Sequence, residues 1–161
     1  MAKFFYTVFL LSLVALDATP LMAEEEFRTF RTGYATIYYA DEKELKSFFR
    51  RISGNDMDLH AYPALAENRL DRIVEKVQAL LDMYPSGFYV NIYVYPRYKK
   101  GHIAFYSEKT KSITTYADKI SDGVLAHEIA HAVINAYFPS PPPTKVAEIL
   151  CQYVDRHLWE E

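Results

Sequence analysis

Residues 124–138, VLAHEIAHAVINAYF, constrain the fold of this chain more than any other segment. Apolar residues surround a polar triplet, His127, Glu128 and His131, on nearly every side of the predicted helix. A helix that is apolar nearly all round belongs in the core of a domain. Burying two imidazoles and a carboxylate without partners would cost on the order of several kcal/mol. The segment therefore predicts a core helix whose polar side chains meet a partner.

The spacing of the triplet favours a metal ion as that partner. His127 and His131 are four residues apart, so both imidazoles project from one face of the helix. Two nitrogens placed in this way can bind one tetrahedral zinc ion at about 2 Å each. Glu128 cannot easily reach the same ion, but it can reach a water bound there and take its proton. We expect zinc ligands at His127 and His131 and a general base at Glu128; a mutually hydrogen-bonded cluster of the three is the alternative.

A catalytic zinc ion needs a third protein ligand and leaves its fourth position to water. The additional histidine of the metzincin class is excluded, because Ile134 and Tyr137 stand at the positions where that class continues its motif. The remaining candidates lie on the predicted last helix: Glu148, Cys151, Asp155 and His157. Glu148, near the start of that helix, is the first choice, with helix capping as its alternative role. Cys151 shares its helix face and is the second choice.

The first 23 residues have the pattern of a secretory signal peptide. Lys3 precedes an apolar run from Phe4 to Leu16, and Ala23 offers a small residue at the expected cut. The run is shorter than the roughly 20 apolar residues that span a membrane. We expect cleavage, an exported protein that is secreted or periplasmic, one domain over residues 24–161, and no stable membrane insertion. An uncleaved anchor is the alternative.

Charge and composition exclude some classes of partner. The 161 residues carry a formal net charge of −3, which gives no reason to expect nucleic acid. The 14 Tyr and 10 Phe favour a half-buried β-sheet, since aromatic residues suit pleated surfaces. Cys151 is the sole cysteine, so no intramolecular disulfide can form.

The pattern of apolar residues predicts an α+β domain. We expect strands over residues 33–40, 88–96, 102–107 and 112–117, and helices over 41–51, 63–84, 122–138 and 144–159. Asp41 with Glu44 resembles a capping box for the first helix, and Asp122 is the expected cap of the third. Short polar turns between the last three strands favour an antiparallel meander.

The segments HEIAHAV and KVAEILCQYV together resemble the gluzincin branch of zinc metallopeptidases, the peptidase-MA-like group. The resemblance covers most of the chain after residue 23, although only the His-Glu-x-x-His motif is highly specific. It implies a zincin-like domain, in which a small, mostly antiparallel sheet packs against the motif helix and a C-terminal helix bearing a glutamate. Many members have Gly after the third ligand, where this chain has Ile149.

The resemblance also implies roles for individual residues. His127, His131 and Glu148 would bind Zn²⁺, with Glu128 as general base. The strand His102–Ser107 would lie at the sheet edge and pair with the backbone of a peptide or protein substrate. A tyrosine or histidine is expected to stabilise the oxyanion; the candidates are His102, Tyr106, Tyr116, Tyr137 and Tyr153, and Tyr153 is preferred.

Three functional hypotheses follow. The first is an exported zinc metallopeptidase that acts on a peptide or protein. The second is a zinc-binding domain of the same fold that is latent or non-catalytic and acts by binding protein. In the third, the histidines are structural and the chain is a tyrosine-rich interaction domain.

Overall fold

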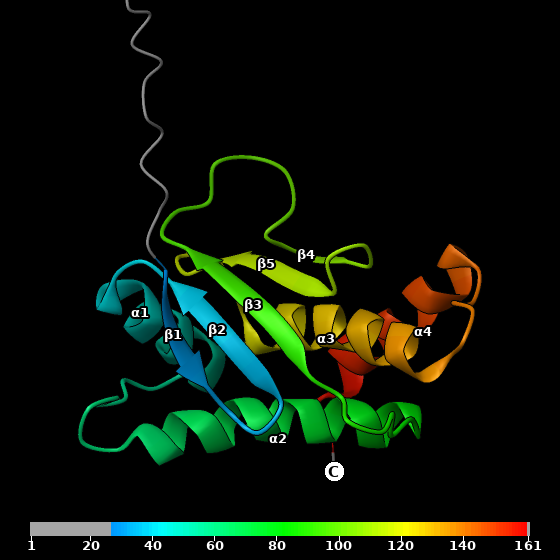
Figure 1. Ribbon diagram of the computed structural model, residues 1–161, viewed down its shortest axis with the longest axis horizontal. Coiled ribbons are helices and arrows are strands. Elements are labelled where there is room, and N and C mark those ends of the chain that lie inside the picture. Colours follow the sequence, from blue (N-terminus) through cyan, green and yellow to red (C-terminus); the bar gives the residue numbers. More distant parts are fainter. Residues whose placement is uncertain (1–26, 161) are drawn as a thin grey trace, which may run out of the picture.

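Four helices lie on one side of a five-stranded sheet (Figure 1). The computed structural model describes residues 27–160, so the expected signal segment 1–23 lies outside the described residues. The strand order is β1-β2-β3-β5-β4. The strands are β1 (Arg28–Arg31), β2 (Ala35–Tyr39), β3 (Val90–Tyr95), β4 (Ala104–Ser107) and β5 (Ser112–Tyr116). The helices are α1 (Glu42–Ser53), α2 (Pro63–Leu81), α3 (Asp122–Tyr137) and α4 (Thr144–His157).

The sheet is mixed, so the prediction of a mostly antiparallel sheet is wrong. β1 with β2 and β4 with β5 are antiparallel pairs, whereas β2 with β3 and β3 with β5 are parallel. The predicted meander fails because β4, although it runs opposite to β3, does not pair with it. Residues 96–103 carry the chain past one strand position to the edge, and the short turn 108–111 then returns β5 into the gap between β3 and β4 (Figure 1).

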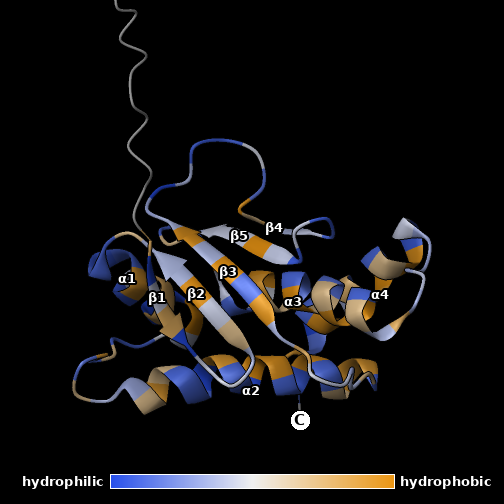
Figure 2. Ribbon diagram, viewed as in Figure 1, coloured by the Kyte–Doolittle hydropathy of each residue, from blue (hydrophilic) through white to orange (hydrophobic). Residues whose placement is uncertain are grey.

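The inner face of the sheet forms the core with the helices. Along β3 the burial alternates, with Val90, Ile92 and Val94 buried and the residues between them half-buried. Apolar and polar residues alternate along this strand (Figure 2). The helices α1 and α3 pack against the sheet, and α2 packs against α3 and α4. The α+β class is therefore confirmed. In the described part of the chain, no helix is long and apolar enough to cross a membrane.

The helix boundaries follow local capping chemistry. Asp41 and Glu44 form the predicted capping box of α1. The cap of α3 is Ser121 and not Asp122: the Ser121 side chain accepts a hydrogen bond from the N–H of Val124. Asp122 instead occupies the first turn of α3. An acidic residue in that turn is stabilised by the helix dipole.

The end of α4 is fixed to the start of α3 by side chains. The Trp159 indole N–H donates to Oδ2 of Asp122 at 2.8 Å. The Arg69 guanidinium donates to the same oxygen at 3.3 Å and lies 4.4 Å from the centre of the Trp159 ring. These contacts tie α4 to both α2 and α3. They hold in place the helix that carries Glu148.

Candidate metal centre and cleft

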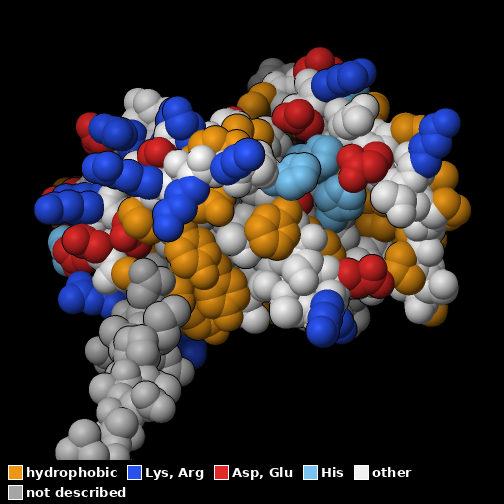
Figure 3. All heavy atoms as spheres, turned by 90° about the horizontal axis from the view of Figure 1, so that it is seen from above, with side chains coloured by type: hydrophobic (Ala, Val, Ile, Leu, Met, Phe, Trp, Pro, Cys, Tyr) orange, Lys and Arg blue, Asp and Glu red, His pale blue; other side chains and the backbone are white. Residues whose placement is uncertain are grey.

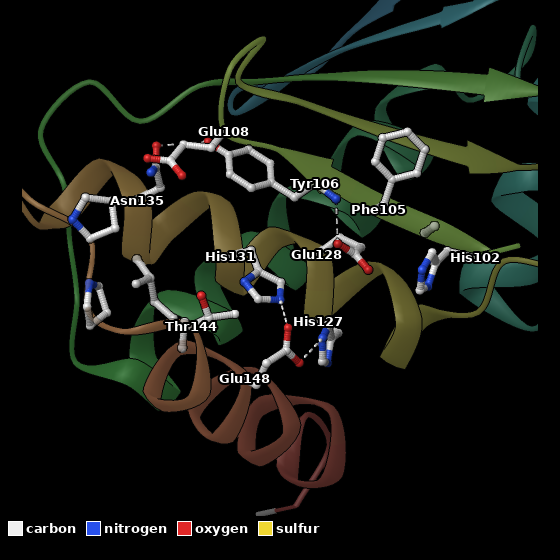
Figure 4. A pocket seen from close by; sticks show the side chains of 15 residues that line it. His102, Phe105, Tyr106, Glu108, His127, Glu128, His131, Asn135, Thr144 and Glu148 are labelled. Carbon is white, nitrogen blue, oxygen red and sulfur yellow. Dashed lines mark hydrogen bonds and ion pairs between the residues drawn. The ribbon is translucent and has the colours of Figure 1, made fainter.

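Two helices bring three predicted ligands together. His127 and His131 project from the same face of α3, and their ring centres are 5.1 Å apart. Glu148 projects from the first half of α4 toward both rings (Figure 4). Its Oε2 lies 3.6 Å from Nε2 of His127, and its Oε1 lies 3.2 Å from Nε2 of His131. The three side chains thus converge as the sequence predicts.

The donor set fits a zinc ion. Tetrahedral ligands at 2.0–2.2 Å from zinc are separated from one another by about 3.3–3.5 Å. Each imidazole Nε2 lies near that distance from the Glu148 carboxylate, His127 from Oε2 and His131 from Oε1. Two imidazoles and a carboxylate are also a ligand set that catalytic zinc uses. The fit therefore rests on both the spacing and the chemistry of the donors.

Burial favours the metal-binding form of His131. Removal from water lowers the pKa of His131 below its usual value, and this effect exceeds the opposing attraction of Glu148. The neutral imidazole is the form that binds a metal, because its free nitrogen lone pair is the ligand. The side chains of His127 and His131 are each about one-fifth exposed, so the cleft still reaches both rings.

Cys151 is the other candidate for the third protein ligand. Its sulfur and one nitrogen of each histidine lie within 4.8 Å of one another. The thiol is fully buried, and burial, followed by the charges of Glu148 and Glu128, raises its pKa to about 12. Metal binding by cysteine needs the thiolate, which the raised pKa of Cys151 disfavours, and Glu148 lines the cleft whereas Cys151 does not; Glu148 is therefore favoured as the ligand.

Glu128 lies in the same cleft beside the two histidines (Figure 4). Its Oε2 accepts a hydrogen bond of 2.7 Å from the backbone N–H of Tyr106 in β4. Burial raises the pKa of Glu128, while the Tyr106 N–H and the neighbouring His127 act in the opposite direction. A desolvated carboxylate that is held in one orientation is suited to accept a proton.

The cleft has a volume of about 410 Å³, which is a common size for a ligand site. Its floor is α3, and its walls are β4 and the start of α4. The histidines form a pale-blue group on the surface, with acidic side chains beside it (Figure 3). The edge position predicted for the strand around residues 102–107 is confirmed by β4.

Several lining residues were not predicted from the sequence: Phe105, Glu108, Asn135, Pro141, Pro142 and Thr144. Asn135 could have been found, because it follows His131 by four residues and so shares the helix face of the two histidines. Its Oδ1 accepts a hydrogen bond from the Tyr106 hydroxyl at 3.1 Å. The other lining residues reach the cleft through the tertiary fold, and no local pattern marks them.

The expected oxyanion candidates separate into two groups. His102 and Tyr106 line the cleft. Tyr153, the preferred candidate, is not among the lining residues; it is 46 % exposed and stacks on His157 at 4.2 Å between ring centres. Tyr116 packs on Tyr95 and Tyr98, and Tyr137 packs on Phe138. The structure thus does not bring Tyr153, Tyr116 or Tyr137 to the cleft. Asp155 and His157 also lie outside it.

Comparison of the chain with family models, with curated proteins and with solved structures finds no match in any of the three.

Proposed function

We propose that this protein is a zinc-dependent metallopeptidase of the gluzincin type. The observation that carries the proposal is the convergence of the Nε2 atoms of His127 and His131 on the Glu148 carboxylate, at 3.6 and 3.2 Å. The position of Glu128 in the same cleft supports it further. A metal site between two helices, open to a cleft and flanked by a carboxylate, is the arrangement that peptide hydrolysis by an activated water needs.

Each residue of the site has a distinct task in this proposal. His127, His131 and Glu148 would hold the ion, and a bound zinc would act as a Lewis acid that lowers the pKa of water to roughly 7. Glu128 takes a proton from the attacking water and later returns it to the leaving amine. The Tyr106 N–H holds the Glu128 carboxylate in the orientation for this transfer. His102 lines the cleft near Glu128 and is our candidate for stabilising the oxyanion.

The substrate in this proposal is a peptide or an unfolded protein segment. β4 lies at the edge of the sheet and forms one wall of the cleft. An extended peptide can add to such an edge through backbone hydrogen bonds. The sequence of residues 1–23 supports export, and mass spectrometry of the mature N-terminus tests this: a chain that begins at Glu24 is expected, and one that begins at Met1 contradicts it.

Replacement of Glu128 by Gln tests the proposed chemistry. The amide cannot accept the proton from water, but its oxygen can still accept the Tyr106 N–H. We expect Glu128→Gln to bind zinc as the parent chain does and to lose at least about 10²-fold in kcat on a library of short peptides. Glu108→Gln is the matched control, since Glu108 lines the same cleft. Full activity of Glu128→Gln would overturn the mechanism.

One observation favours a second candidate function. If Cys151 joined His127, His131 and Glu148, the zinc would have four protein ligands and no open position, which is typical of structural sites. The chain would then be a zinc-stabilised binding domain or a latent peptidase. Hydrolysis of short peptides by the untreated protein would exclude both forms.

A further inference from the structure

A row of uncharged side chains crosses the outer face of the sheet, on the side away from the helices. In strand register, each residue of the row lies beside the next one: Thr29 in β1, Tyr38 in β2, Tyr93 in β3, Thr114 in β5 and Phe105 in β4. We call these five residues the outer row. It runs the full width of the sheet and contains neither an acidic nor a basic side chain.

The outer row already accepts an aromatic side chain of the protein itself. Phe27 lies against Tyr93 and Tyr95 with its ring edge-on, at 5.8 and 5.9 Å between ring centres. This is the favourable arrangement of two aromatic rings. Tyr38 and Tyr93 stack on each other at 4.7 Å with 12° between their planes. The face therefore binds an aromatic side chain of a polypeptide segment through ring-to-ring contacts.

The outer row is continuous with the cleft. Phe105 is 45 % exposed and belongs to both the row and the cleft lining. On the same face, Figure 3 shows hydrophobic side chains beside the histidines and a larger hydrophobic group further along, with other side chains or backbone between them. A polypeptide that leaves the cleft past Phe105 meets Thr114 and then Tyr93. The row is thus placed to bind the part of a substrate that lies beyond the cleaved bond.

We propose that the outer row is an exosite for unfolded protein substrates that carry aromatic or large apolar residues. The inference rests on the proposed peptidase function, since it assumes that the cleft binds a peptide. Nucleic acid does not fit, because the row has no cation to meet phosphate. Large uncharged aromatic side chains are enriched in protein interfaces, and a few of them usually dominate the binding energy.

Binding can be measured without turnover in the zinc-loaded Glu128→Gln protein. The probe is fluorescently labelled lysozyme that has been reduced and carboxymethylated, so that its chain is unfolded. We expect the added changes Tyr38→Thr and Tyr93→Thr to raise its Kd about tenfold or more, as loss of an interface hot spot does. Thr keeps the preference for strand at both positions. An eight-residue peptide that fills the cleft alone should bind both proteins within about twofold.

Tyr84→Thr is the control, because Tyr84 is 62 % exposed and lies outside the outer row. An unchanged Kd for the unfolded chain, or an equal loss for the peptide, would overturn the exosite. Self-association that the double change abolishes would overturn it as well, by assigning the face to a second copy. If the outer row binds the unfolded chain as expected but the parent protein cleaves no peptide or protein, only the peptidase proposal fails.

Discussion

The backbone N–H of Tyr106 donates to Oε2 of Glu128 at 2.7 Å, which joins the edge strand β4 to the proposed general base. The backbone N–H and C=O groups of successive residues in a strand point to opposite sides. Those of Ala104 and Tyr106 therefore point to the same side, toward the cleft. The bond to Glu128 occupies one of the donors on that side. A substrate strand paired with β4 therefore meets the N–H and C=O of Ala104 and the C=O of Tyr106.

This arrangement predicts how a substrate responds to backbone methylation. In a paired substrate, the N–H of every second residue would donate to the backbone C=O of Ala104 or Tyr106. We therefore expect N-methylation of a peptide substrate to lower kcat/KM at alternate residues only. A loss of about tenfold per position corresponds to one hydrogen bond of roughly 1.4 kcal/mol. Kinetics on a series of singly methylated peptides measures it. A loss without alternation would contradict strand pairing at β4.

Glu148 and Cys151 are distinguished by replacing each with Ala. We expect Glu148→Ala to weaken zinc binding at least about a hundredfold, whereas Cys151→Ala keeps both zinc and hydrolysis. The absorption of the cobalt-substituted protein gives an independent reading, because a cysteine ligand produces an intense charge-transfer band in the near ultraviolet. The presence of that band in the parent protein, and its loss in Cys151→Ala, would contradict a His₂Glu site.

His102 and Tyr153 are predicted to differ in their effect on catalysis. Tyr153→Phe should keep kcat within about twofold, because Tyr153 stacks on His157 outside the cleft. His102→Ala should lower kcat by about 10² or more, with little change in zinc content, if His102 stabilises the oxyanion. Steady-state kinetics on one peptide compares them. A large loss of kcat in Tyr153→Phe would instead support Tyr153 as the residue that stabilises the oxyanion, as the family resemblance implies.

Trp159 is predicted to stabilise the position of α4. Trp159→Ala removes the hydrogen bond to Asp122 and the contact with Arg69, and should lower the free energy of unfolding by about 1–3 kcal/mol. Arg72→Ala is the control, since Arg72 lies further from the Trp159 ring, at 5.9 Å. Urea denaturation measures both variants. Equal losses of unfolding free energy in Trp159→Ala and Arg72→Ala would contradict this role of Trp159.

Local patterns predicted most of the helices and strands but not the order of the strands. The capping box of Asp41 and Glu44 and the end of α3 before Pro139 depend on neighbouring residues, so the sequence reveals them. The parallel pairing of β3 with β5 depends on where residues 96–103 lead the chain, and no local pattern encodes that path. β1 was missed because it is a mostly exposed strand of four residues.

In the candidate site, too, some relations follow from local spacing and others depend on the tertiary fold. His127, Glu128 and His131 lie on one helix, so their spacing alone fixes their relation. Tyr153 was misplaced because it follows Glu148 by five residues. At about 100° per residue it points about 140° away from Glu148 around the helix axis. Cys151 follows Glu148 by three residues and stays on its side of the helix. The cleft contributions of Phe105 and Glu108 require the tertiary fold.

The zinc content of the protein, purified without a histidine tag, tests the central claim most directly. Elemental analysis should find about one zinc ion per chain in the parent protein and none in the His127→Ala/His131→Ala variant. The His60→Ala variant should keep its zinc, since His60 is exposed and pairs with Glu42. A parent protein without zinc, or a double variant with the same zinc content as the parent, would contradict the account.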